Sequence, residues 1–209
     1  MMKHLKHLKH LTAVMIIMFC GVTAFADNTA ERIMKNCAAK FGNAPSVTVD
    51  FAIAQNDGSA TGTMVMAKRL FSLSTADISI WFDGKTQWTY MANGNEVNIT
   101  EPTGEELMES NPFELISTFA QNFNCRLLKS PATADIIELT PKHKDMNISS
   151  AKITVSKSTG WPTAMIINFE GGNSTSVSVS KVTVGKTMSV AQFRFDQKTH
   201  KGVQVVDLR

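Results

Sequence analysis

The sequence predicts a mainly β domain, either a barrel or a sandwich, in which helices cover one open face. Short runs of alternating apolar and polar residues recur along most of the chain, and turn residues separate them. Residues 29–41 instead repeat their apolar side chains at steps of three and four, which is the helical pattern. A second helical segment interrupts the strands between about residues 105 and 120. Two amphipathic helices in an otherwise all-β chain indicate a cover over one face of a sheet.

Residues 1–26 have the pattern of a cleaved signal peptide. The positive start consists of Lys3, Lys6 and Lys9. An apolar run over residues 11–22 follows, and Ala24-Phe25-Ala26 is the small-x-small end that a signal peptidase recognises. The run is too short to span a membrane, so a retained anchor is the less favoured alternative. We therefore expect residues 27–209 to form a single exported domain in the periplasm.

The charge of the chain is concentrated in this leader. Three of the 21 basic residues and none of the 18 acidic residues lie in residues 1–26, so 18 of each sign remain after cleavage. A formally neutral chain with interspersed signs gives no electrostatic case for binding nucleic acid or an anionic lipid surface. Nucleic-acid partners are therefore not expected.

Catalytic, metal and cofactor sites are not indicated. Residues 27–209 contain two histidines, His143 and His200, and neither has a ligand partner at metal spacing. They also contain no G-x-S-x-G elbow and no glycine-rich loop between a strand and a helix. Cys37 and Cys125 form either a disulfide or two buried thiols, and the sequence does not decide between them. We expect no enzyme activity and no cofactor.

The first predicted helix, over residues 29–41, has one apolar face, which must pack against another apolar surface. Asn28 or Thr29 can cap its start, and Gly42 suits its end. Its apolar positions are Ala30, Ile33, Met34, Cys37, Ala38 and Phe41.

The predicted strands fall on both sides of a helical insertion. The insertion consists of a short turn at Glu105–Met108 and a helix that begins at Asn111-Pro112-Phe113-Glu114, with Asn as cap and Pro in the first position. Asp83-Gly84-Lys85 and Asn93-Gly94-Asn95 have the composition of hairpin turns, which predicts an antiparallel meander. The predicted strands are 46–55, 61–67, 69–75, 78–82, 86–91, 95–100, 123–129, 135–140, 150–156, 163–169, 173–184, 191–195 and 203–206.

Methionine and aromatic residues mark a candidate binding surface on these strands. Methionine side chains are flexible and polarizable, so they suit a surface that accepts variable apolar chains, although ordinary core packing explains any single one as well. Trp81, Trp88 and Tyr90 cluster around one predicted hairpin. Successive residues of a strand point to opposite faces, so the sequence leaves open which face of residues 78–82 lines a cavity. Arg69, among apolar neighbours, could donate to carbonyl groups at helix ends or be an ordinary solvated charge.

Five motifs, in order along the chain, resemble the LolA-type outer-membrane lipoprotein carriers. The strongest is Asp83-Gly84-Lys85-Thr86-Gln87-Trp88-Thr89-Tyr90, which is similar to the family's D-G-K-x-x-W-x-Y hairpin. The others are Lys68-Arg69 with Phe71 and Leu73, Asn111-Pro112-Phe113, Leu139-Thr140-Pro141-Lys142, and Phe193-Arg194-Phe195 followed by Gly202-Val203. The family's Pro after the Lys-Arg pair is absent, because Leu70 follows Arg69 directly, and this departure indicates a distant branch.

This resemblance implies an unclosed antiparallel β-barrel, or half-barrel, with a helical lid over a hydrophobic cavity. It implies a monomeric carrier that binds the acyl chains of lipoproteins, receives them from an inner-membrane release complex and delivers them to an outer-membrane acceptor. Arg69 would be a latch that holds the empty lid closed. The candidate ligand-binding residues are Met34, Phe51, Met64, Met66, Phe71, Leu73, Ile80, Trp88, Tyr90, Phe113 and Ile116.

Two other classes of function stay open. A sensor or scaffold of the same fold would bind lipoprotein or another amphiphile and signal through a partner protein. Transfer of cargo to an acceptor membrane separates a carrier from a sensor. An enzyme ranks third, and it would require ester turnover that is abolished by changing one His or Ser.

Overall fold

The structure is a computed structural model that describes residues 22–209 except 56–57, and no side chain before Thr29. Most of the predicted signal peptide, residues 1–21, therefore lies outside the described residues. Residues 22–26 form the start of a helix, and their cleavage stays a prediction. None of the helices in the described ranges is both long enough and apolar enough to cross a membrane.

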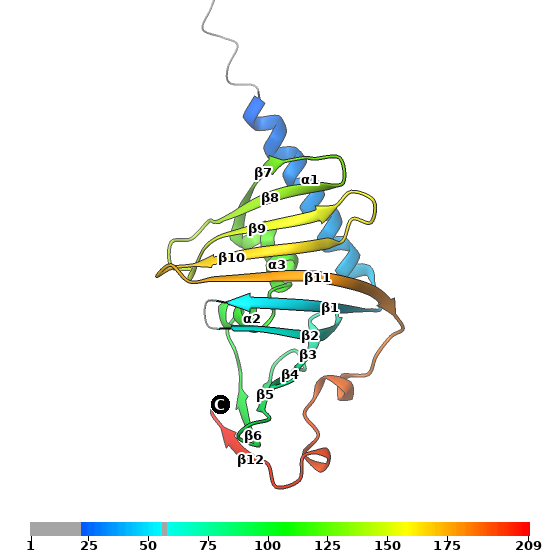
Figure 1. Ribbon diagram of the computed structural model, residues 1–209, viewed down its shortest axis with the longest axis vertical. Coiled ribbons are helices and arrows are strands. Elements are labelled where there is room, and N and C mark those ends of the chain that lie inside the picture. Colours follow the sequence, from blue (N-terminus) through cyan, green and yellow to red (C-terminus); the bar gives the residue numbers. More distant parts are fainter. Residues whose placement is uncertain (1–21, 56–57) are drawn as a thin grey trace, which may run out of the picture.

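The described strands form one open sheet (Figure 1). Its order is β12-β6-β5-β4-β3-β2-β1-β11-β10-β9-β8-β7, so β12 and β7 are its two edges. The strands are β1 Ser46–Gln55, β2 Gly58–Ala67, β3 Leu70–Thr75, β4 Ile78–Phe82, β5 Gln87–Met91, β6 Glu96–Thr100, β7 Phe123–Lys129, β8 Ala134–Pro141, β9 Ile148–Ser156, β10 Pro162–Phe169, β11 Ser174–Gly185 and β12 Gln204–Asp207. The prediction of a mainly β fold with an unclosed sheet and a helical cover is confirmed.

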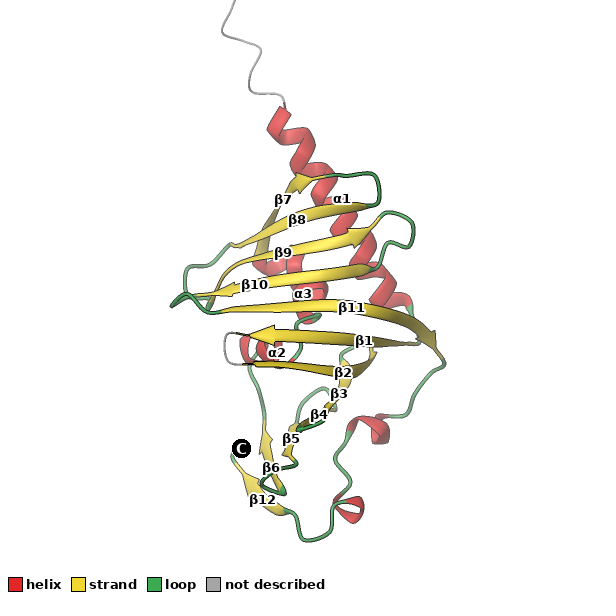
Figure 2. Cartoon of the chain, in the orientation of Figure 1, coloured by secondary structure: helices red, strands yellow, loops and turns green. Residues whose placement is uncertain are grey.

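Three helices lie over one face of this sheet, and we call them the lid (Figure 2). They are α1 Val22–Asn43, α2 Gly104–Ser110 and α3 Glu114–Asn122. Helix α1 begins before the predicted start at residue 29 and contacts both β7 and α3. Thr103 and Glu106 cap α2 reciprocally. The predicted cap at Asn111 is wrong, because α3 begins at Glu114 with Phe113 as its N-cap; the Asn111 side chain instead accepts the N–H of Phe113 at 3.0 Å in the turn before the helix.

The register of the strands sorts their side chains into a lid-facing and an outer face. Val49 of β1 pairs with Met64 of β2, Met64 pairs with Leu73 of β3, and Leu73 pairs with Ile80 of β4. Cross-strand partners share one face, and neighbours along a strand alternate between faces. This apolar row therefore lies on the same side as the lid.

The C-terminal part differs from the sequence prediction. Residues 191–195 were expected to form a strand, but Val190–Phe193 is a 3₁₀ helix, η1, and a second, η2, spans Gln197–Thr199. The expectation of an all-antiparallel sheet is also wrong for β12, which pairs with β6 in parallel. A parallel pair needs a long crossover connection, and residues 101–203, which contain α2, α3 and β7 to β11, separate β6 from β12 along the chain. Side-chain capping of η1 by Ser189 and Gln192 competes with strand formation.

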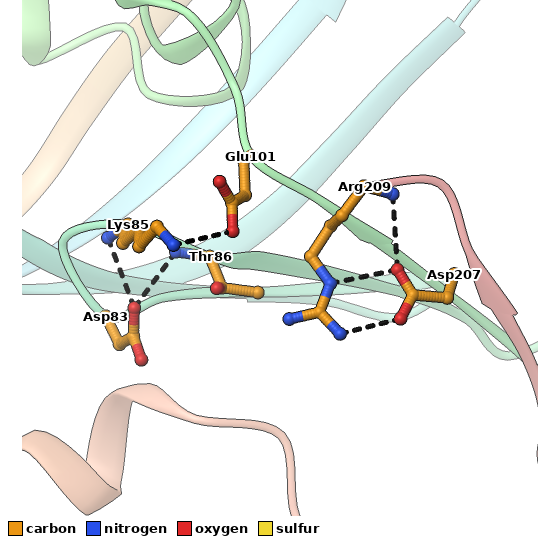
Figure 3. A network of polar contacts seen from close by, with 6 residues as sticks. All are labelled: Asp83, Lys85, Thr86, Glu101, Asp207 and Arg209. Carbon is orange, nitrogen blue, oxygen red and sulfur yellow. Dashed lines mark hydrogen bonds and ion pairs between the residues drawn. The ribbon is translucent and has the colours of Figure 1, made fainter.

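The predicted Asp83-Gly84-Lys85 turn is present and well bonded (Figure 3). Gly84 has a φ of 99°, a conformation that favours glycine. One carboxylate oxygen of Asp83 accepts the N–H groups of Lys85 and Thr86 at 3.2 and 3.0 Å, and the Lys85 ammonium lies 3.1 Å from Glu101. At the nearby chain end, the Arg209 guanidinium donates to Asp207 of β12 (Figure 3). These contacts fix the edge of the sheet around β4, β5, β6 and β12.

Candidate functional site

The space between the lid and the sheet is one continuous apolar interior. Met34 of α1, Met64 of β2 and Ile116 of α3 are each 0% exposed, although they come from three separate elements. Phe113, between α2 and α3, lies 5.9 Å from the ring of Phe41, so it joins the two parts of the lid. Buried apolar residues of β8, β9 and β10 extend the same interior, and they are Ile137, Leu139, Ala151, Ile153, Val155, Met165 and Ile167.

Nine of the eleven candidate ligand-binding residues face this interior. Seven are buried in it: Met34, Phe51, Met64, Met66, Phe71, Phe113 and Ile116. Leu73 and Ile80 are half-buried at its margin and pack against it. The question of which face of residues 78–82 lies inward is therefore answered, because Ile80 and Phe82 point to the lid side. Contact with a ligand stays a prediction for each of them.

Trp88 and Tyr90 do not belong to this interior. Trp88 pairs with Trp81, and Tyr90 with Ser79, so all four point to the outer face of the sheet. The sequence could not decide this point because β4 carries large apolar residues on both faces. The sequence prediction that placed Trp88 and Tyr90 on the same surface as Met64 and Phe71 is therefore wrong.

The aromatic residues of the outer face hold the C-terminal segment, and we call this contact the clasp. The His200 ring lies 4.5 Å from Tyr90, 4.6 Å from Phe195 and 6.0 Å from Trp81, measured between ring centroids. Arg194 donates to Asp83 at 2.8 Å, and Phe193 is fully buried. The D-G-K-x-x-W-x-Y hairpin and the F-x-F segment are therefore partners in one structure. Both motifs are visible in the sequence, but their contact is not.

Polar contacts attach the lid to the rest of the molecule at sites that sequence reasoning did not assign. The Lys142 ammonium donates to the carbonyl of Ala120 at 2.7 Å, near the C-terminus of α3. A cation at this position compensates the unpaired carbonyl groups and the negative end of a helix. Ser110 of α2 donates to the Gln87 side chain of β5 at 2.9 Å. Lys142 belongs to the L-x-P-K motif, and this motif is the feature of the sequence that could have pointed to its contact with α3.

Arg69 is solvent-exposed, which is one of the two readings that the sequence left open, and its role as a latch stays a prediction. It is exposed in the turn between β2 and β3, after Lys68 with its φ of 56°, and β3 begins at Leu70. Among the hydrogen bonds between described residues, none comes from its guanidinium. Its positive charge instead acts on the carboxylate of Glu114, the first residue of α3. This charge lowers the pKa of Glu114 and so partly offsets the effect of burial.

Replacing Glu114 by glutamine is expected to stabilise the protein at pH 7 but not at pH 4. Burial raises the pKa of Glu114, and the positive charge of Arg69 only partly offsets this effect. Folding therefore favours the protonated carboxyl, so stability is greatest below the ordinary glutamate pKa and falls as pH rises through the raised value. Melting temperatures of both proteins at the two pH values test this. A lower melting temperature for Glu114→Gln at pH 7 would mean that the attraction to Arg69 dominates.

Reactive and metal-binding groups are sparse in the described part of the chain. Cys37 is 1% exposed, and burial raises the pKa of its thiol to about 12, so it stays a neutral, unreactive side chain. Cys125 lies on β7, and the two sulfurs are not bonded to each other. Within residues 22–55 and 58–209, no group of three or more His, Cys, Asp or Glu side chains is arranged to hold a metal ion.

Solved structures share this fold at low sequence identity. An uncharacterized conserved protein of Thermus thermophilus superposes with a TM-score of 0.58 at 13% identity, covering 86% of this chain and 99% of that one. A DUF1329 family protein of Desulfovibrio piger gives a TM-score of 0.50 at 11% identity, with coverage of 86% and 99%. A LolA superfamily protein of Nitrosomonas europaea gives 0.43 at 14% identity, with coverage of 80% and 98%.

Sequence comparison identifies the family. No match was found among curated proteins. The profile of the family described as outer membrane lipoprotein carrier protein LolA matches residues 22–171, which is most of the chain. The matched region contains the three lid helices and the strands β1 to β10. The chain therefore belongs to the LolA family of outer membrane lipoprotein carrier proteins.

Proposed function

We propose that this protein is a periplasmic carrier that shelters the acyl chains of lipoproteins between its lid and its sheet. The observation that carries the proposal is the continuous apolar interior beneath α1 and α3 in a member of the lipoprotein carrier family. The carrier would receive its cargo from an inner-membrane release complex and pass it to an outer-membrane acceptor. The predicted leader, residues 1–26, supports export to the compartment in which this transfer takes place.

The packing of the interior fits reversible binding. Because lid and sheet side chains already contact one another, an acyl chain enters only if the lid separates from the sheet. Each buried methylene contributes roughly 0.8 kcal/mol, so ten of them contribute about 8 kcal/mol. Closure of the lid competes with this gain and lowers the net affinity. Met34 and Met64 suit such an interior, because flexible thioether chains repack around different ligands.

Replacing Arg69 by leucine is expected to give a carrier that retains acyl chains and transfers them poorly. Loss of the positive charge beside Glu114 removes an attraction that holds α3 near the β2–β3 turn. The closed state then competes less with cargo, so binding tightens and release slows. Transfer of a labelled lipoprotein from the loaded carrier to acceptor vesicles measures the effect. Arg209→Leu is the matched control, because Arg209 pairs with Asp207 at 2.6 Å beside β12, the sheet edge opposite β7. Equal transfer rates for Arg69→Leu and the parent protein would refute the latch.

The first test of the proposal is mass spectrometry of the tagged protein recovered gently from its own envelope. Acylated lipoproteins that copurify with the parent protein, and more strongly with Arg69→Leu, are the expected result. A transfer assay with acceptor membranes then separates a carrier from a sensor, since only a carrier must deliver cargo. Preparations that contain no acylated protein in either variant would overturn the carrier and direct the search to a protein partner.

A further inference from the structure

An open groove lies at the seam between helix α1 and the ends of the strands β7, β8 and β9. Its volume is about 360 Å³. One wall is α1, and the other comes from the connections that follow β7 and β9, which lie on the same side of the sheet in Figure 1. Six of its lining residues define its chemistry, and they are Arg32, Ile33, Cys37, Asp135, Val155 and Lys157.

The floor of this groove is apolar and belongs to the interior. Cys37 and Val155 are buried members of the core beneath the lid, and Ile33 packs against it. Burial keeps the Cys37 thiol neutral, so the floor carries no charge. An apolar chain lying in the interior could therefore continue into the groove without meeting a charged group.

The rim of the groove carries uncompensated positive charge. Asp135 is its acidic member, and that carboxylate already lies 3.5 Å from the Lys157 ammonium and accepts the Ser130 hydroxyl at 2.6 Å. Arg32 is an exposed residue of the rim. The Lys40 ammonium lies nearby, 5.3 Å from the centre of the Trp161 ring, and its side chain crosses Gly160 at the edge of the groove. With Asp135 and Lys157 neutralising one another, Arg32 and Lys40 leave this end positive.

The region around α2 has the opposite charge. The depression beside α2 is lined by five acidic residues and one lysine, namely Glu105, Glu106, Glu109, Asp145, Glu170 and Lys144. Glu105 and Glu109 both accept hydrogen bonds from Asn147. The lid–sheet seam therefore has a basic opening beside α1 and an acidic opening beside α2. Electrostatic attraction then directs an amphiphile with a charged head to the opening of opposite charge.

We propose that the groove beside α1 binds the anionic head, a phosphate or a carboxylate, of an amphiphile whose chain lies beneath the lid. The inference rests on the proposed function, because it places the chain in the same interior. Arg32 supplies a charge-assisted hydrogen bond to the head, Lys40 adds positive charge at the edge of the groove, and Ile33, Cys37 and Val155 contact the first methylenes. The groove thus selects among amphiphiles by the sign of the head, which acyl-chain burial alone cannot do.

Trp161 is a built-in reporter for this groove. It follows Gly160 directly and contacts Phe41, with ring centroids 5.0 Å apart. The other two tryptophans, Trp81 and Trp88, lie on the outer face of the sheet. A protein carrying Trp81→Phe and Trp88→Phe therefore has one tryptophan, whose fluorescence reports on a head group bound beside Lys40.

The experiment compares tetradecyl phosphate with tetradecyltrimethylammonium, both below their micelle concentrations. We expect the phosphate to bind about tenfold more tightly, as one charge-assisted contact implies, and to change Trp161 fluorescence. Arg32→Glu should remove this preference, and raising the salt concentration should reduce it. The matched control Arg209→Glu, beside β12 at the sheet edge opposite β7, should retain it. Circular dichroism of each variant confirms that the fold is kept.

Three outcomes would overturn the inference. Equal binding of the two probes would be compatible with the proposed acyl-chain carrier but would refute the anionic head site. A preference that survives Arg32→Glu would place the anion elsewhere and refute this groove. Failure of both probes to bind would reject the shelter for acyl chains itself, and with it the proposal that rests on it.

Discussion

Replacing Phe113 by alanine is expected to lower the free energy of unfolding by about 3–5 kcal/mol. Phe113 is 2% exposed, lies between α2 and α3, and contacts Phe41 of α1. Its removal leaves a cavity at the point where the lid segments meet, and the hydrogen bond from the Phe113 N–H to Asn111 at 3.0 Å opposes movement of the backbone into it. The loss is large relative to the roughly 5–15 kcal/mol that stabilises a typical domain. Chemical denaturation followed by circular dichroism measures it.

The matched control for Phe113 is an apolar residue outside the interior. Val184 of β11 is 54% exposed, so Val184→Ala should change the free energy of unfolding by less than about 0.5 kcal/mol. A loss below about 1.5 kcal/mol for Phe113→Ala would show that the lid tolerates a cavity there. The lid would then be loosely packed in the closed state, and the competition between closure and cargo would be weaker than proposed.

Alternation and turn chemistry were enough to predict most of the sheet. Residues 46–55 and 78–82 form strands with the predicted bounds, because turn residues follow each segment in the sequence. The helix at residues 29–41 was found because its apolar face is unambiguous, although α1 begins at Val22. In these segments local propensity and tertiary packing favour the same conformation, which is the condition under which a sequence pattern is reliable.

The C-terminal segment could not be predicted because its conformation depends on a distant partner. Phe193-Arg194-Phe195 has the alternation of a strand, but Phe193 ends the 3₁₀ helix η1. The Phe195 ring instead lies against Trp81 of β4 and Tyr90 of β5, and Arg194 pairs with Asp83. Such contacts between residues about a hundred positions apart leave no local periodicity. The same clasp explains why Tyr90 lies outward, since its ring packs against Phe195 and His200 on that face.

Arg69 illustrates a different limit of prediction from sequence. The family resemblance implies that Arg69 latches the lid, and in the structure its positive charge acts on Glu114 at the start of α3. Its partner was missed because Glu114 is far away along the chain and forms part of an ordinary helix start. A charged residue in the first helical turn is explained locally by the helix dipole, so the sequence offers no reason to look for a second role.

Lengthening a bound acyl chain is expected to raise its affinity by roughly fourfold for each methylene, the equivalent of about 0.8 kcal/mol. Between alkyl phosphates of ten and fourteen carbons, the dissociation constant should therefore fall by roughly two hundredfold. A chain adsorbed on the surface leaves much of each methylene in water and gives a shallower slope. The affinity should stop rising at the chain length that fills the interior, because further methylenes remain exposed to water. Titration calorimetry below the micelle concentration measures both the slope and its end point.

Two matched substitutions assign this chain-length dependence to one face of the sheet. Leu73 and Trp88 are both half-buried, but Leu73 faces the lid and Trp88 faces outward. Leu73→Ser should weaken binding of the fourteen-carbon chain, because it places a hydroxyl at the margin of the interior, whereas Trp88→Ser should leave the binding constant nearly unchanged. The reverse result would locate the acyl chain on the outer face beside the clasp. Trp88 and Tyr90 would then be ligand-binding residues after all, and the lid would cover a core that never opens to cargo.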